Sequence, residues 1–98
     1  MKFRQYNESF VHRNGGTNAS KIQEYDGKKF KYTYESGNAY ERFRVEMFDG
    51  FKLNPIASMT DLGEEPNSSS YINDEIQAKN RYASLCQSAE KYVKMLIS

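Results

Sequence analysis

The sequence predicts an α+β fold: a four- or five-stranded antiparallel meander sheet with one long C-terminal helix packed on one face. Residues 20–54 alternate apolar and polar side chains with a period of two, which is typical of strands. Three dipeptides that favour tight turns interrupt the alternation: Asp26-Gly27, Ser36-Gly37 and Asp49-Gly50. Residues 70–97 contain no Pro or Gly and place apolar residues three and four apart, which is typical of an amphipathic helix.

The chain of 98 residues is long enough for one domain with a modest core. We expect four parts: an N-terminal strand and loop at 1–19, the β-meander at 20–54, a long loop at 55–69 and the helix at 70–97. Within the first part, the polar, Gly-rich stretch 13–19 indicates a flexible loop. Pro55 is expected to end the fourth strand.

Assumed turn types give the predicted sheet a register. A three-residue loop at 25–27 places Ile22 opposite Phe30, and a similar loop at 48–50 places Val45 opposite Leu53. The residues that then share the core face are Ile22, Phe30, Tyr32, Tyr34, Phe43, Val45, Met47, Phe51 and Leu53. Because these residues are all apolar, the turns and the alternation agree with one another.

The opposite face of the predicted sheet is basic and aromatic. Its candidate ligand-binding residues are Lys21, Tyr25, Lys29, Lys31, Tyr40, Arg42, Arg44, Phe48 and Lys52. The assumed register sets Lys31 opposite Arg42 and Lys29 opposite Arg44. Like charges directly opposite destabilise a sheet by roughly 0.2–1 kcal/mol per pair. An anion on this face would explain why such pairs are tolerated, whereas a solvated face of ordinary strand residues is the alternative.

Single-stranded nucleic acid or a nucleotide suits this face, because cations hold phosphates and aromatic rings stack on bases. The order of four antiparallel strands followed by a helix resembles the Whirly and Pur-type single-strand binders, which pair through their helices. The resemblance is one of topology and assigns no role to any residue of this sequence. The formal net charge is only +1, so binding would depend on segregated charge.

The alternative function is protein–protein contact. The composition is similar to that of phage-type accessory proteins, which act as inhibitors or adaptors against host defence or transcription machinery. We expect short strands, so the long helix should overhang the sheet and expose an apolar stripe. The stripe that would contact a host protein or a second copy in a homodimer consists of Tyr82, Leu85, Ala89, Tyr92 and Leu96.

Motifs for catalysis are absent from the sequence. One His and one Cys cannot build a zinc site, and neither a nucleotide-binding Gly-rich motif nor a nucleophile elbow occurs. We therefore expect a protein without enzymatic activity, cofactor or metal. No apolar run is long enough for a membrane span or a signal peptide, which predicts a cytoplasmic protein without a membrane partner.

Overall fold

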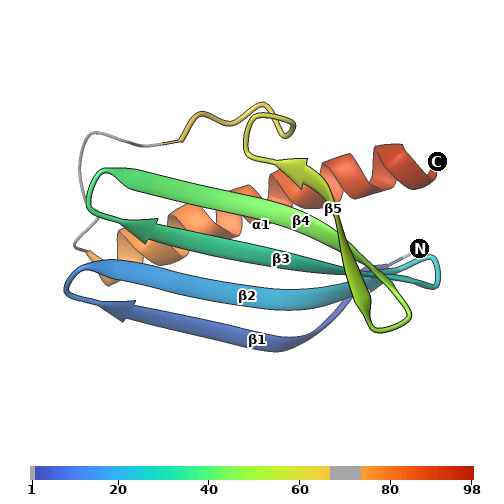
Figure 1. Ribbon diagram of the computed structural model, residues 1–98, viewed down its shortest axis with the longest axis horizontal. Coiled ribbons are helices and arrows are strands. Elements are labelled where there is room, and N and C mark those ends of the chain that lie inside the picture. The colour runs from blue at the N-terminus through green and yellow to red at the C-terminus, as the bar shows by residue number, and fades with distance from the viewer. Residues whose placement is uncertain (1, 67–73) are drawn as a thin grey trace.

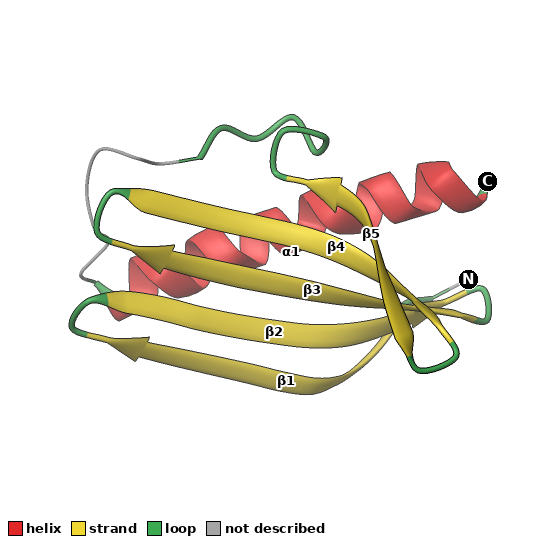
Figure 2. Cartoon of the chain, in the orientation of Figure 1, coloured by secondary structure: helices red, strands yellow, loops and turns green. Residues whose placement is uncertain are grey.

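The computed structural model describes residues 2–66 and 74–98 and confirms the predicted α+β fold (Figure 1). Five strands pair in sequence order as an open antiparallel meander. The elements are β1 (Arg4–Arg13), β2 (Gly16–Tyr25), β3 (Lys28–Gly37), β4 (Tyr40–Asp49), β5 (Lys52–Ser58) and α1 (Glu75–Ile97). The helix crosses one face of the sheet, and no other helix or strand of the described residues covers the opposite face (Figure 2).

The N-terminal part forms a full hairpin, so the predicted flexible loop at 13–19 is wrong. β1 and β2 pair from Arg4 to Arg13 and are joined by Asn14-Gly15, where Gly15 has a φ of 112°. A Cβ at Gly16 would collide with the Ser36 carbonyl oxygen, so β2 can approach β3 closely only with glycine there. The Gly-rich composition thus marks a turn and a tight strand contact.

The β2–β3 turn has two residues, and the predicted three-residue loop is wrong. Asp26 and Gly27 both have positive φ, 55° and 75°, as a type I′ turn requires. The pairing therefore slips by one residue from the expected register, and Gln23 instead of Ile22 lies opposite Phe30. A one-residue slip moves every side chain of a strand to the other face. Odd-numbered residues of β2 consequently face the helix.

The β4–β5 turn differs from the prediction in the same way. Gly50-Phe51 forms a two-residue turn, Asp49 pairs with Lys52, and Leu53 pairs with Phe48 on the face away from α1. Phe51 is fully exposed at the turn, so neither it nor Leu53 joins the predicted core face. β5 also continues through Pro55 to Ser58, which corrects the expected strand end. Proline is tolerated there because β5 is an edge strand.

The β3–β4 turn lies at Asn38-Ala39, two residues beyond the predicted Ser36-Gly37. This displacement changes the pairing by an even number of residues, so the faces of β3 and β4 remain as predicted. The resulting core faces α1 and is nearly inaccessible to solvent. Its sheet residues are Ala19, Phe30, Tyr32, Tyr34, Phe43, Val45 and Ala57, and its helix residues are Ala78, Tyr82, Leu85, Cys86, Ala89 and Val93.

The lengths of the sheet and the helix match, so the predicted overhang is wrong. Four strands have ten residues each, about 33 Å at ~3.3 Å per residue. The helix has 23 residues, about 35 Å at ~1.5 Å per residue. Its N-cap is Asp74, whose side chain accepts a hydrogen bond from the Ile76 amide. Ser70 and Asn73, which from their residue type and position could also cap the predicted helix, lie outside the described residues.

A buried ion pair joins the helix to β4. The Arg81 guanidinium binds both carboxylate oxygens of Glu41 at 2.9 Å, and the Tyr34 hydroxyl donates to Glu41 at 2.7 Å. Arg81 also reaches the Glu64 carboxylate at 3.5 Å, and Ser88 donates to Glu64 at 3.0 Å. The segment after β5 is therefore held against the helix by polar contacts as well as by buried Met59.

Replacing Arg81 with methionine should lower the free energy of unfolding by about 3 kcal/mol, because the Glu41 carboxylate, 2 % exposed, would lose its charged partner. Urea unfolding followed by circular dichroism measures this change. Arg42→Met is the matched control, because Arg42 is exposed, and it should cost less than about 0.5 kcal/mol. Equal, small losses in both variants would contradict the importance of the buried pair.

Burial should also make the protein sensitive to alkali. Desolvation raises the pKa of the Cys86 thiol from 9.0 to about 11, and it raises the pKa of the Tyr32 and Tyr82 hydroxyls as well. Each raised pKa stabilises the fold fully below the ordinary pKa of the group and less as the pH rises through the raised value. The free energy of unfolding should therefore fall between pH 9 and 11.

The Cys86→Ala variant separates the thiol from the tyrosines. It should start from a lower stability because a buried side chain is truncated, but it should lose less stability than the wild type between pH 9 and 11. Urea unfolding at several pH values measures how steeply the free energy of unfolding falls with pH in the wild type and in the variant. Identical slopes would mean that the thiol does not contribute to the pH dependence.

Candidate ligand-binding face

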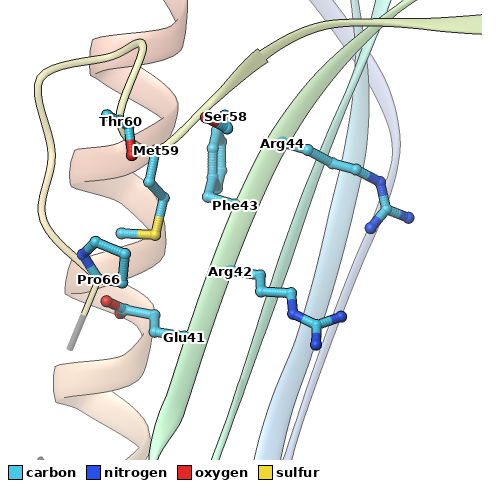
Figure 3. A pocket seen from close by; sticks show the side chains of 8 residues that line it. All are labelled: Glu41, Arg42, Phe43, Arg44, Ser58, Met59, Thr60 and Pro66. Atoms are coloured by element: carbon cyan, nitrogen blue, oxygen red, sulfur yellow. The ribbon is translucent and has the colours of Figure 1, made fainter. Parts of the chain in front are cut away.

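The face of the sheet that points away from α1 is called the open face here. Pairing places even-numbered residues of β2 and β4 and odd-numbered residues of β3 on it. Figure 3 shows the alternation on β4, where Arg42 and Arg44 project to one side and Glu41 to the other. The open face carries six cationic side chains, Arg4, Arg13, Lys29, Lys31, Arg42 and Arg44, and three carboxylates, Glu24, Glu35 and Glu46.

Six of the nine predicted ligand-binding residues lie on the open face: Lys29, Lys31, Tyr40, Arg42, Arg44 and Phe48. The two-residue turn of β2 puts Lys21 and Tyr25 on the helix side instead. Lys21 is 8 % exposed, and the Tyr25 ring stacks on Phe3 with centroids 4.4 Å apart. Lys52 pairs with Asp49 beside the β4–β5 turn, on the side of the sheet that faces α1. These three residues therefore do not join the open face.

The like-charge pairs expected from the sequence do not occur. Lys31 lies opposite Glu46 and Lys29 opposite Glu24, because the turns set a different register. Arg44 forms ion pairs of 3.2 Å with both Glu35 and Glu46. Such exposed pairs contribute only about 0–1 kcal/mol each. Carboxylates thus separate the cations, and the inference of an anion from repulsion across the strands no longer holds.

Several cations nevertheless remain without a carboxylate partner in the described part of the chain. Neither Lys29 nor Lys31 makes an ion pair there, although Lys31 faces Glu46 across the strands. The Arg42 guanidinium lies 5.5 Å from the Tyr40 ring centroid, a cation–π contact. Lys29, Lys31 and Arg42 can therefore contact a ligand without first breaking an ion pair of the described residues.

A shallow hollow of about 170 Å³ lies on the open face next to Lys31. Its floor is a row of small hydroxyl side chains, because Ser9 pairs with Ser20 and Ser20 pairs with Thr33. Thr33 in turn pairs with Arg44. The Thr33 hydroxyl is buried and has no hydrogen-bond partner among the described residues. The hollow is bordered by one cation, Lys31, and one carboxylate, Glu35, and its small side chains leave room for an oxygen-rich group next to the Lys31 ammonium.

The sequence reasoning missed this hydroxyl row. The sequence predicts Ser20 as the first residue of the meander and places Ser9 in the N-terminal strand. Ser is uncommon in strand interiors compared with β-branched and aromatic residues, so the two serines were an available signal. Their alignment with Thr33 depends on the β1–β2 register, which includes a bulge between Tyr6 and Ser9. That irregularity is not readable from the local pattern.

Aromatic side chains lie at both ends of β4 on the open face. Tyr40 is 44 % exposed, and Phe48 is half-buried beside Leu53 at the other end. On β1, the Arg4 guanidinium lies 6.0 Å from the Tyr6 ring centroid. The open face therefore offers rings at its corners and cations between them.

A second cavity, of about 250 Å³, lies at the edge of β4 beyond the end of β5. Met59, Thr60 and Pro66 border it from the loop (Figure 3). The carboxylate of Glu41 is bound by Arg81, and the Arg42 and Arg44 side chains point away from the helix side. The cavity is therefore mainly apolar, and the two cations among its lining residues, Arg42 and Arg44, already belong to the open face.

The predicted partner interface on the helix is largely used by the chain itself. Tyr82, Leu85 and Ala89 are at most 6 % exposed, because they pack on the aromatic face of the sheet. The Tyr92 hydroxyl donates to the Ile56 carbonyl at 3.3 Å. Leu96 is 51 % exposed and lies next to Met95, which is 73 % exposed. Only the C-terminal end of the predicted stripe is accessible.

Among residues 2–66 and 74–98, no cluster of His, Cys, Asp or Glu has the arrangement of a metal site. No helix in the described part of the chain is long and apolar enough to cross a membrane. Comparison of the chain with protein-family models, curated proteins and solved structures finds no match.

Proposed function

We propose that this chain is a non-enzymatic binding protein whose open face holds an anionic ligand, single-stranded nucleic acid or a nucleotide. The observation that carries the proposal is the hydroxyl-lined hollow beside Lys31, on a sheet face where cations outnumber carboxylates six to three. The face is left uncovered by the only described helix.

Different residues of the open face would contact different parts of the ligand. Lys29, Lys31 and Arg42 would contact phosphates, and the hydroxyls of Ser20 and Thr33 would donate to phosphate or sugar oxygens. The rings of Tyr40 and Phe48 would stack on bases, which is worth about 1–3 kcal/mol per base. Arg44 would contribute less because Glu35 and Glu46 already bind it.

Replacing Lys31 with glutamate should weaken the binding of a labelled single-stranded oligonucleotide at least tenfold at low salt, because a cation beside the hollow becomes an anion. Fluorescence anisotropy over a range of salt concentrations measures the affinity. The slope of log K against log salt should become shallower by about 0.7 for each phosphate contact that is lost.

Lys91→Glu is the matched control for this prediction. It changes the net charge of the chain by the same amount, but Lys91 is exposed on the helix, on the other side of the sheet. It should change the affinity less than twofold. Equal effects of the two variants would indicate unspecific attraction, and no binding to oligonucleotides or nucleotides at low salt would rule out the proposed ligand.

Protein–protein contact is the second candidate function, in which the chain is a phage-type inhibitor or adaptor of a host protein or pairs with a second copy. Its support is the accessible apolar end of α1, where Tyr92, Met95 and Leu96 line a shallow hollow of about 270 Å³. Met95 and Leu96 are more than half exposed. Apolar contact of this kind is insensitive to salt, unlike binding of a polyanion.

If the helix end forms a homodimer, Met95→Asp should convert the dimer to a monomer without loss of stability, because Met95 is exposed in the single chain. Light scattering coupled to size-exclusion chromatography measures the molar mass and so distinguishes dimer from monomer. Phe51→Asp is the control, since it also places an acid at an exposed apolar residue, but at the β4–β5 turn. A monomeric wild type at all concentrations would exclude the homodimer.

A further inference from the structure

A pocket of about 230 Å³ opens between β1, β2 and the first half of α1, on the side of the sheet opposite the open face. It is called the side pocket here and is lined by Glu8, Phe10, Lys21, Lys79, Tyr82 and Ala83. The residues come from the β1–β2 hairpin and from α1, which is distant from that hairpin in the sequence. Its volume is below the ~300–1,000 Å³ of pockets for drug-sized ligands, so it fits only a small molecule.

Lys21 is the unusual residue of the side pocket. Only 8 % of it is exposed, and its ammonium donates to the Gln5 side-chain oxygen at 3.1 Å. No carboxylate lies within ion-pair distance of it in the described part of the chain. A buried ammonium held by a neutral amide is costly unless a counter-charge is near. Glu8 lines the same pocket but forms no ion pair with Lys21, so the ammonium can still accept a bound anion there.

The strand β1 has a bulge opposite Lys21. Asn7 has a φ of 55°, and the strand pairing shifts between Tyr6 and Ser9, so Asn7 and Glu8 together lie opposite Lys21. A bulge of this kind bends a strand and redirects side chains, and bulges are over-represented beside functional sites. Here the bulge lies directly at the side pocket.

The pocket wall is aromatic. The rings of Phe10 and Tyr82 have centroids 6.1 Å apart. The Lys21 ammonium lies 6.0 Å from the Tyr82 centroid, and the Lys79 ammonium lies 5.6 Å from the Phe10 centroid. Two ammonium groups thus flank two rings, an arrangement that suits a ligand with both a negative charge and an apolar body.

Glu8 limits the charge of that ligand. Its carboxylate lies in the pocket lining and close enough to Tyr82 and Cys86 to act on them electrostatically. Two cations and one carboxylate give the pocket one surplus positive charge. A dianion such as a phosphate monoester would be repelled by Glu8 more than a monoanion would. The charge balance therefore favours a single carboxylate.

We propose that the side pocket binds a small aromatic or aliphatic monocarboxylate, with its carboxylate on Lys21 and Lys79 and its apolar body against Phe10 and Tyr82. The site is separate from the open face, because Lys21 faces the helix and Lys31 faces away from it. It does not depend on the function proposed for the open face.

Benzoate is the probe, benzamide is its neutral isostere, and inorganic phosphate carries charge without an apolar body. Titration followed by ¹H–¹⁵N NMR should show saturable binding of benzoate, with the largest shifts at Glu8, Lys21, Lys79 and Tyr82. Benzamide and phosphate should each bind at least tenfold more weakly. The Lys21→Met and Lys79→Met variants should each bind benzoate at least fivefold more weakly. The control Lys91→Met should leave the affinity for benzoate unchanged.

Each outcome of this experiment either supports or overturns the proposed carboxylate site. Lys79 is exposed, so its variant folds even if Lys21→Met does not. Lack of saturable benzoate binding, equal affinity for benzamide, tighter binding of phosphate, or unchanged affinity in Lys79→Met would overturn the proposal. Oligonucleotide binding measured in the same Lys79→Met protein reports on the open face separately, so failure of one site is distinguishable from failure of the other.

Discussion

The alternation of side chains along five strands is the constraint on which the other features of this protein depend. All four connections between strands contain two residues. The pairing of each strand with the next therefore fixes which of its side chains point to which face of the sheet. That alternation puts Phe30, Tyr32 and Tyr34 under the helix and Lys29 and Lys31 on the open face. The core, the open face and the side pocket are three consequences of one pairing pattern.

Polar contacts as well as apolar packing hold the helix on the sheet. Arg81 binds Glu41 on β4, and the Gln23 amide on β2 donates to Glu90 at 2.8 Å. Apolar contact alone would let α1 rotate or slide over a flat aromatic surface, whereas directional bonds at both sides of the core define one position. Lys21 differs, since its buried ammonium donates to Gln5 and forms no ion pair with any carboxylate of the described residues.

The two proposed sites use charge in different ways. The open face is broad, exposed and only partly neutralised by Arg44 and its carboxylates, which suits a long anion that several cations contact weakly. The side pocket is small and has one buried cation, which suits a compact anion that is held in a single orientation. The sheet separates them, so one chain could use both at once.

Local signals in the sequence determined the fold class, the helix and the composition of β3 and β4, because alternation and helical spacing are visible within one element. They did not determine how β2 and β5 pair. Asp26-Gly27 is compatible with a two- or a three-residue turn, and these differ in which face receives Ile22 and Lys21. Only tertiary contacts decide between them: α1 brings Glu90 to Gln23, and the β1 bulge makes room opposite Lys21. Such partners are far apart in the sequence, so no local pattern records them.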